Sequence, residues 1–517
     1  MKNRPRNIVL VLSDQQRSDT LGYAGVWKDI TPNLDRIGEE GTLFENCFSV
    51  QPICSPARAC IQSGRFATEK GNYKNGLTIP EDTDTIGKYV KEAGYDTAYI
   101  GKWHIYKDHF LDKLFNKYDV PVKNRMGYDF WEASNALEFT SHAYSGHLYD
   151  NENHKIKIEG YRADFITSLA IDYLKKHPKG RPFFLTVSFV EPHHDANMTF
   201  EGPKGSKEKY KDPAIPKDLE GLKGDYEEFL PDYLGMCANL DMNVGRIEEA
   251  LKEIGEWEDT VFLYSADHGC HFRTRNSEYK RSCHEASIHV PLVAHGPGFE
   301  NRGSVKGLTS ILDIPASILK AAGVRIPDTY RGKPLQEDVY QEEEEIFVQI
   351  SEDSLGRCLR TKRWKYCASY DEGNASLTRP DSDVYYESFL YDLENDPAEH
   401  VNLVDDPAYE EIRKELKEKL LQKIWEVEGK RPQILTYEED PHKDQKYSFR
   451  MSLSEMLEDE KSRKVIEETA PFLITNKYVH LGTNMKFYFL AGYIEKVPFY
   501  GKKIRLLKKK LEALNGE

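Results

Sequence analysis

Four short apolar runs, each followed at once by polar residues, restrict the fold of this chain more than any other feature. The runs cover residues 7–12, 97–100, 183–190 and 261–264, and amphipathic stretches at about 31–41, 161–176 and 226–254 lie between them. Short continuous apolar runs are typical of strands that are buried on both faces of a parallel sheet. Such strands alternating with helices predict a doubly wound α/β domain.

Polar side chains follow each run directly. They are Asp14 and Gln15 after the first run, Lys102 and His104 after the second, His193 and His194 after the third, and Asp267 and His268 after the fourth. Ligands of open α/β sheets bind outside the carboxyl ends of the strands. A single polar residue at a strand end is most often a helix cap, but four such ends predict one site that combines acids, a cation and imidazoles.

The segment Cys54-Ser55-Pro56-Ala57-Arg58 adds a candidate nucleophile. Pro56 suits the first position of a helix, which would place Cys54 and Ser55 just before the helix N-terminus. Free N–H groups and the positive end of the helix dipole favour anions there and lower the pKa of a thiol. Arg58, about one turn further on, could reach back toward the same anion. We therefore expect this segment to bind an anion.

The 517 residues divide into three expected regions. Residues 1–340 form the α/β domain. An acidic run at 342–345 marks the start of an α+β subdomain at 341–430, with a small antiparallel sheet and a helix from about 407 to 428. Residues 431–517 form a helical extension that ends in a basic amphipathic segment. This extension packs on its own subunit, forms a contact within a homo-oligomer, or forms a rim over the site.

Charge and cysteine content exclude several classes of partner and compartment. The chain has 71 Lys and Arg against 86 Asp and Glu, a net charge of −15, which argues against nucleic-acid binding. No apolar run approaches the roughly 20 residues that span a membrane. We find no secretory signal, so a cytoplasmic location is expected unless a leader has been removed. The eight cysteines form no Cys-x-x-Cys pair, which indicates buried thiols in a reducing compartment.

Together these motifs resemble the type I, formylglycine-dependent sulfatases of the alkaline-phosphatase superfamily, over about residues 5–430. The matching positions are Cys54, Pro56 and Arg58, the segments 31–35, 101–104 and 267–269, Lys280 with 285–291, and 390–397. The resemblance implies an alkaline-phosphatase-like fold, in which a doubly wound mixed sheet is flanked by helices and followed by a smaller α+β subdomain. It also implies that a formylglycine-generating maturation enzyme oxidises Cys54 to formylglycine, an aldehyde that acts as its hydrate.

The resemblance assigns a metal site to Asp14, Gln15, the modified Cys54, Asp267 and His268. Oxygen ligands suit Ca²⁺, which is the expected ion. The commoner family pattern has Asp at position 15 and Asn at position 268. Here Gln15 removes one negative charge and His268 offers nitrogen, so Mn²⁺ or Mg²⁺ is less excluded than usual. This variant also occurs in relatives that hydrolyse phosphonate monoesters and phosphodiesters.

The resemblance also implies the catalytic roles. One hydroxyl of the hydrate attacks sulfur while Arg58, Lys102 and Lys280 neutralise the sulfate oxygens. His193 shares with Lys280 the protonation of the leaving-group oxygen. His104 is the expected base for the elimination that expels sulfate and restores the aldehyde.

Two further histidines are expected to contact the substrate. His194 follows His193 at the end of the third run. His284 lies four residues after Lys280 and would share its face if this stretch were helical. A structural role for His284 is an equal alternative.

These residues predict a sulfatase that acts on a sulfate ester, with a small sulfated sugar as the expected substrate. The alternative within the family is a phosphonate monoester hydrolase or phosphodiesterase that uses the same site. The alternative outside enzymes is a non-catalytic anion-binding protein in which Cys54 stays unmodified. No nucleic acid and no membrane is expected as a partner.

Overall fold

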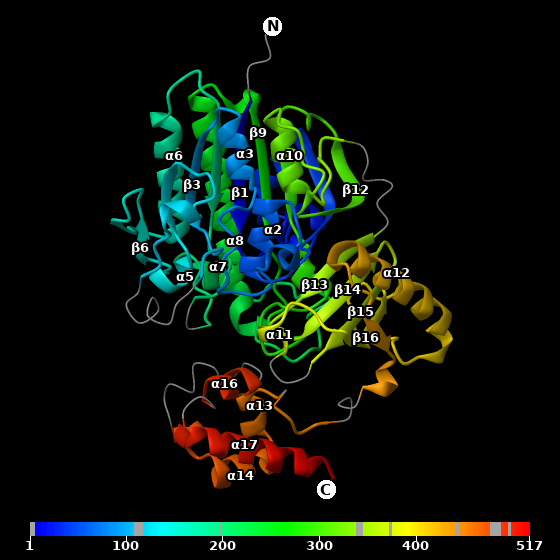
Figure 1. The fold of residues 1–517 in the computed structure, drawn as a ribbon. Coiled ribbons are helices and arrows are strands. Elements are labelled where there is room, and N and C mark those ends of the chain that lie inside the picture. The colour runs from blue at the N-terminus through cyan, green and yellow to red at the C-terminus, as the bar shows by residue number, and fades with distance from the viewer. Residues whose placement is uncertain are drawn as a thin grey trace.

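In the computed structural model, the four predicted strands lie side by side at the centre of one large mixed sheet (Figure 1). They are β1 (Asn7–Ser13), β3 (Asp96–Lys102), β8 (Phe183–Ser188) and β9 (Thr260–Ala266), in the order β9-β1-β8-β3, and they pair in parallel. The structure describes residues 6–107, 117–195, 198–337, 345–371, 375–440, 445–449, 451–475, 487–494 and 498–516. The predicted doubly wound α/β fold with a mixed sheet is confirmed.

The sequence reading missed the strands at both edges of this sheet. On one side lie β2 (Thr42–Phe48), β10 (His289–Val290), β11 (Leu292–His295) and β12 (Gly303–Ser310), with β11 antiparallel to both β9 and β2. On the other side lie β4 (Phe130–Ser134), β5 (Ser141–His142), β6 (Ser145–Tyr149) and β7 (Lys155–Lys157). Most of these strands are short or carry polar residues, and they therefore lack the continuous apolar run that marks a central strand.

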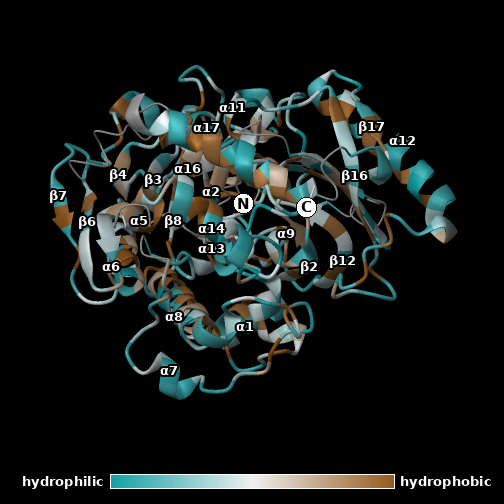
Figure 2. Ribbon diagram, turned by 90° about the horizontal axis from the view of Figure 1, so that it is seen from below, coloured by the Kyte–Doolittle hydropathy of each residue, from teal (hydrophilic) through white to brown (hydrophobic). Residues whose placement is uncertain are grey.

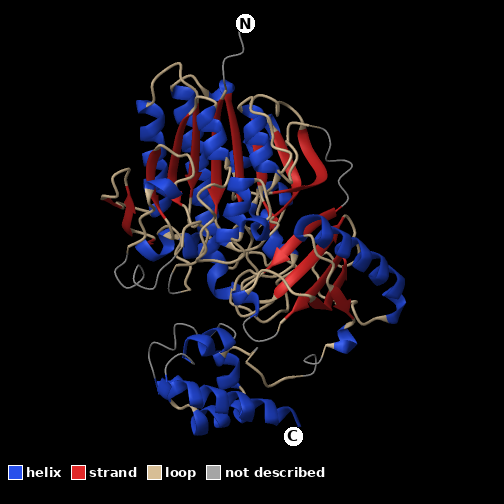
Figure 3. Ribbon diagram, in the orientation of Figure 1, coloured by secondary structure: helices blue, strands red, loops and turns tan. Residues whose placement is uncertain are grey.

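Helices cover both faces of the sheet, as the ribbon coloured by secondary structure shows (Figure 3). One face packs against α1 (Pro32–Glu40), α6 (Arg162–Lys176) and α8 (Tyr226–Glu253). The other packs against α2 (Cys54–Ser63), α3 (Ile86–Glu92) and α10 (Asp313–Ala321). In β1, Val9 and Val11 point into the first layer, whereas Ile8 and Leu10 point into the second. This alternation explains why the run is continuously apolar. The short helices α5 (Leu137–Thr140), α7 (Ser206–Lys209) and α9 (Glu285–Ile288) lie in the connections.

A second sheet follows, formed by β13 (Glu345–Ile350), β14 (Leu355–Thr361), β15 (Trp364–Tyr370) and β16 (Val384–Asp392) in antiparallel order. A short β17 (Gln433–Leu435) pairs with β16 in parallel, the short helix α11 (Ala375–Thr378) lies between β15 and β16, and α12 (Glu410–Glu428) covers the sheet. The apolar residues of the second sheet belong to the same buried cluster as Ile8 and Leu10 of β1. The second sheet is therefore anchored to the first through a shared core. The expected boundary at 340–341 falls outside the described residues.

The helices of the extension pack on a core of their own. They are α13 (Leu453–Glu458), α14 (Glu460–Thr469), α15 (Phe472–Thr475), α16 (Phe487–Ile494) and α17 (Pro498–Ala513). Ser452 and Glu455 form the capping box that their spacing predicts. The extension lies below the main body in Figure 1 and in front of it in the view from below (Figure 2). Among the described residues, no helix is long and apolar enough to cross a membrane.

Candidate active site

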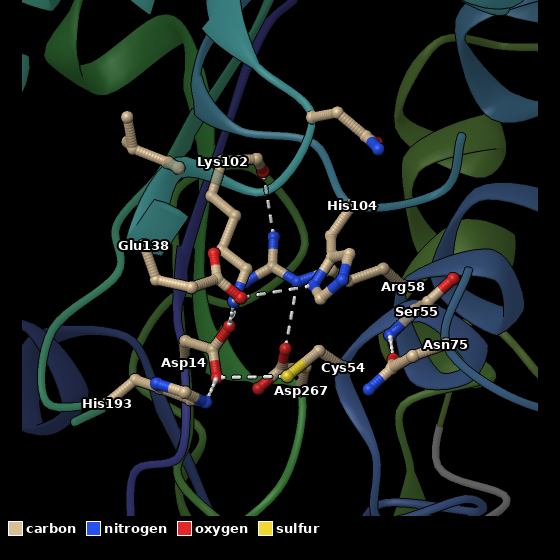
Figure 4. Close-up of polar contacts among 12 residues, drawn as sticks. Asp14, Cys54, Ser55, Arg58, Asn75, Lys102, His104, Glu138, His193 and Asp267 are labelled. Carbon is tan, nitrogen blue, oxygen red and sulfur yellow. Dashed lines mark hydrogen bonds and ion pairs between the residues drawn. The ribbon is translucent and has the colours of Figure 1, made fainter. Parts of the chain in front are cut away.

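The polar residues at the carboxyl ends of the central strands meet in one buried cluster (Figure 4). Asp14 forms ion pairs with Lys102 Nζ at 2.7 Å and with Arg58 Nη2 at 3.0 Å. Arg58 Nε forms a further ion pair with Asp267 at 2.8 Å. All four side chains are less than 5 % exposed. Charges this deep in the protein are tolerated only when they are paired, so the cluster forms one electrostatic unit.

Cys54 lies at the centre of this cluster. Its Sγ is 3.1 Å from Lys280 Nζ, 3.2 Å from His268 Nε2 and 3.5 Å from Asp14 Oδ1. Burial raises the pKa of the Cys54 thiol, but the nearby Lys102 and Lys280 outweigh it, and the pKa falls well below the usual value. The predicted nucleophile and the predicted cations are therefore brought together.

The helix that carries Cys54 begins two residues earlier than expected. Ile53 is extended and its carbonyl accepts from Ala57 N at 3.0 Å, so α2 starts at Cys54 and Pro56 occupies its third position rather than its first. Pro56 is tolerated there because N–H groups of the first turn have no partner within the helix. The Asn75 side chain accepts from Ser55 N at 3.0 Å and so satisfies one of these groups.

His268 directs its Nε2 at the carboxylates. Its Nδ1 lies 3.0 Å from the carbonyl oxygen of Gly269, and because a carbonyl can only accept, Nδ1 carries a hydrogen. Nε2 then faces Asp14 Oδ1 and Asp267 Oδ1, each at 3.5 Å. A ring nitrogen beside two carboxylates could bind a cation held between them, and a carbonyl that fixes the other ring nitrogen is usual for metal-binding histidines.

Gln15 and the two carboxylates fit a cation as well. Gln15 Oε1 is buried and has no hydrogen-bond partner among the residues that the structure describes. Burial and the neighbouring Asp14 raise the pKa of Asp267, which is the repulsion that a shared cation would relieve. The ligand atoms of Asp14, Cys54, Asp267 and His268 all lie within 4.8 Å of one another. The predicted metal ligands are thus close together, with Gln15 beside them.

Lys280 and His193 form a pair beside Cys54. Lys280 Nζ lies 2.8 Å from His193 Nε2, and His193 Nδ1 lies 2.6 Å from the carbonyl oxygen of His194. The carbonyl again requires a hydrogen on Nδ1, and an ammonium at Lys280 can only donate, so Nε2 is the acceptor of their contact. His193 therefore orients Lys280 within reach of Cys54.

Glu138 is a site residue that the sequence reading missed. Its Oε1 accepts from Lys102 Nζ at 2.8 Å and lies 3.6 Å from His104 Nδ1 (Figure 4). Burial opposes ionisation of Glu138, but Lys102 and His104 lower its pKa to about 2. In turn, although burial disfavours a charged imidazole, Glu138 raises the pKa of His104. Glu138 stands in the short helix α5, away from any central strand end, and no motif marks it.

Arg58 lies differently from the expectation. In addition to the ion pairs with Asp14 and Asp267, its Nη1 donates to Ser188 Oγ at 2.7 Å and to the Lys102 carbonyl at 2.9 Å. A guanidinium engaged on four sides by the protein orients the carboxylates and does not reach back past the N-terminus of α2. We therefore regard Arg58 as a positioning residue for Asp14 and Asp267.

The two histidines expected to contact substrate lie further out. The His194 ring lies between those of His193, at 4.1 Å between ring centroids, and Tyr279, at 4.8 Å, and is tilted against both, so it forms a wall beside Lys280 and His193. His284 is not on a helix with Lys280, because α9 begins only at Glu285. Its Nε2 contacts Tyr391 Oη at 3.1 Å and its ring packs on Phe389, both on β16. His284 therefore faces the second sheet, which favours the structural alternative.

Two family models, several sequence relatives and several solved structures match this chain. Residues 6–324 match the family described as "Sulfatase", and residues 277–426 match "N-sulphoglucosamine sulphohydrolase, C-terminal". An ulvan-active sulfatase of Formosa agariphila is 31% identical over 450 residues, which cover 81% of each chain. An N-acetylglucosamine-6-O-sulfatase of Bacteroides thetaiotaomicron is 24% identical, with 79% of this chain and 84% of the relative covered. A structure described as a complex with its substrate D-glucosamine-2-N,6-O-disulfate superposes with a TM-score of 0.64 at 22% identity, over 83% of this chain and 99% of the other.

Proposed function

This chain belongs to the sulfatase family and is a sulfuric ester hydrolase, and from this premise we propose that it hydrolyses the sulfate ester of a small sulfated sugar. The observation that carries the proposal is the position of Cys54 in contact with both the carboxylate cluster, through Asp14, and Lys280. A sulfate group at this position would meet the Lys280 ammonium and a cation held by the carboxylates. The names of two relatives, one active on ulvan and one on N-acetylglucosamine 6-sulfate, support a carbohydrate substrate.

The proposal includes a divalent cation held by Asp14, Gln15, Asp267 and His268 together with the modified Cys54. The orphaned Gln15 Oε1 and the position of His268 Nε2 beside two carboxylates support this ligand set. Ca²⁺ is the first candidate and Mn²⁺ or Mg²⁺ the alternatives, because one ligand is nitrogen. When bound, the cation would polarise the sulfate oxygens and help to ionise the nucleophile.

The proposal also includes conversion of Cys54 to formylglycine by a maturation enzyme. The Cys54 sulfur stands where the oxygen substituents of the modified side chain would be. The hydrate would supply one hydroxyl as nucleophile and a second through which sulfate can leave. Mass spectrometry of the Cys54 peptide, from protein made in its native host, tests this step. An intact thiol would instead favour the non-catalytic anion-binding alternative.

The residues around Cys54 then divide the proton transfers. Lys280 protonates the leaving-group oxygen, and a proton from solvent restores its ammonium. His193, whose Nε2 accepts from Lys280 at 2.8 Å, orients the lysine for this transfer. Lys102 stabilises negative charge on the sulfate oxygens and holds Asp14 in place. On the opposite side His104, oriented by Glu138, accepts the proton of the second hydroxyl. His194 forms the wall that the sugar would contact.

Rates on matched substrates test the reaction class. We expect kcat/KM for an aryl sulfate to exceed that for the corresponding aryl phosphonate monoester, and a screen of sulfated mono- and disaccharides should identify a preferred sugar. A preference for the phosphonate would favour the alternative hydrolase.

Cys54→Ser should give a chain that is sulfated once and then inactive, because a serine lacks the second hydroxyl; sustained turnover would contradict the proposed elimination.

A further inference from the structure

Three buried cysteines from two parts of the chain meet at a second cluster, away from Cys54. Cys283 comes from the loop before α9, Cys358 from β14 and Cys367 from β15. Cys358 and Cys367 are direct cross-strand partners in the second sheet. The three sulfur atoms lie within 4.8 Å of one another, and each residue is at most 1 % exposed.

The spacing of the sulfurs is that of metal ligands. Ligands at the usual zinc–sulfur distance of about 2.3 Å stand roughly 4 Å apart around one ion. The three sulfurs therefore need little movement to bind one ion between them. Paired cysteines of a disulfide would leave the third thiol without a role.

The surroundings of the three sulfurs favour a thiolate at Cys283. Hydrogen bonds from the other two thiols lower the pKa of Cys283 well below the usual value. Burial raises the pKa of Cys358, and the hydrogen bond to Cys283 raises that of Cys367, so these two keep their protons until an ion binds. The fully buried Lys365 ammonium, 2.7 Å from Glu285 and 2.5 Å from Glu399, adds positive charge that favours ionised sulfur nearby.

We propose that Cys283, Cys358 and Cys367 bind a thiophilic closed-shell cation, Zn²⁺ or Cu⁺, which ties the second sheet to the catalytic domain. Soft thiolate ligands select these ions and disfavour Ca²⁺ or Mg²⁺, so this centre is chemically distinct from the oxygen-rich site around Asp14. Each thiol that binds releases its proton to solvent, and the ion replaces those protons. The centre is independent of the sulfatase reaction, because none of its ligands belongs to the active site.

Cadmium titration tests the centre. The full chain with Cys54→Ala, which removes the active-site thiol, is titrated with Cd²⁺ in saturating Ca²⁺. We expect the ultraviolet charge-transfer absorption of cadmium thiolates, saturating at one ion per chain. Adding Cys358→Ser should remove this absorption, whereas Cys237→Ser, which alters an equally buried cysteine outside the cluster, should retain it. Absorption that is absent, or that survives Cys358→Ser, would overturn the proposal.

A second measurement covers the case in which Cys358→Ser does not fold. X-ray absorption of the cadmium-loaded Cys54→Ala chain counts the sulfur neighbours directly. Three are expected, and fewer would overturn the proposal, as would a disulfide between any two of these cysteines in the purified protein.

Native mass spectrometry after loading with Zn²⁺ or with Cu⁺ shows which ion is held more tightly against chelators. Retention of neither ion would also overturn the proposal.

Discussion

Lys280 contacts both Cys54 and His193, so its removal should affect the leaving group most. We expect Lys280→Ala to lower kcat/KM by about 10²–10³, the usual loss when one donor to a developing negative charge is removed. The loss should be larger for a sugar sulfate than for a nitrophenyl sulfate, because an alkoxide needs a proton more than a phenolate does. Rates over a series of leaving groups measure this. An equal loss for every leaving group would assign Lys280 to sulfate binding instead.

Glu138 sets the charge state of His104. The Glu138 carboxylate raises the pKa of His104, and His104 must be neutral to accept a proton, so kcat should rise with pH through that pKa. Glu138→Gln removes the negative charge and should lower the pKa of His104. The rising limb of the kcat profile should therefore move to lower pH.

The pH profile has a matched control. Glu132→Gln alters a half-buried carboxylate of β4 that has no contact with the site, and its profile should stay unchanged. Glu138→Gln should also reduce kcat, because Lys102 loses the carboxylate that it contacts at 2.8 Å. A limb that stays in place in Glu138→Gln would show that His104 is not the base.

At the scale of elements, Gly101 allows β3 to deliver Lys102 and His104 to the site. Its φ is +111°, and a Cβ at this position would lie 1.9 Å from the Ser188 carbonyl oxygen on β8. Gly101→Ala should therefore destabilise the protein by more than about 4 kcal/mol, since backbone on a paired strand cannot give way. Gly94→Ala, at φ +91° with nothing within 4 Å, should cost only about 1 kcal/mol. Denaturant unfolding compares the two, and equal losses would contradict the steric argument.

The sequence predicts the elements that are uniform in character and misses those that depend on partners. The runs that became β1, β3, β8 and β9 are apolar throughout because both faces are buried, so their position and the residues at their ends could be inferred. The strand β2 mixes polar and apolar residues without a regular pattern and pairs with β11 and β12, which come some 250 residues later in the chain. The contact of Glu138 with Lys102 and those of Arg58 with Ser188 and the Lys102 carbonyl likewise depend on where distant segments meet. No local pattern records such pairings.

At the scale of the whole molecule, the cores predict what can be removed. The second sheet shares one core with the catalytic domain, whereas the extension has a separate core and is joined to the rest by contacts such as the exposed pair Lys223–Glu458. A chain that ends at Glu439 should fold, with a Tm within a few degrees of the full chain and full activity on a small aryl sulfate. A chain that ends at residue 344 should not fold. Loss of aryl sulfatase activity in the longer truncation would show that the extension completes the site.

The net charge of −15 reflects the surface of the molecule and does not predict the charge of its active site. Lys280 and Lys102, with the proposed cation, would supply positive charge in a buried region, where charges interact more strongly than at the surface, whereas Arg58 is already paired with Asp14 and Asp267. A small anion should therefore be attracted over a short range only. This favours a small sulfated sugar over a long polyanion bound across an acidic surface.

The burial of α2 has a consequence for the order of events in the cell. Every residue of this helix is buried, and Cys54 is 1 % exposed. No protein large enough to be an enzyme could reach the Cys54 sulfur in the folded domain. A maturation enzyme would have to act on the newly made chain before the sheet closes over α2. Synthesis, modification and folding would then compete in time, and a variant that folds faster could leave more of the protein unmodified.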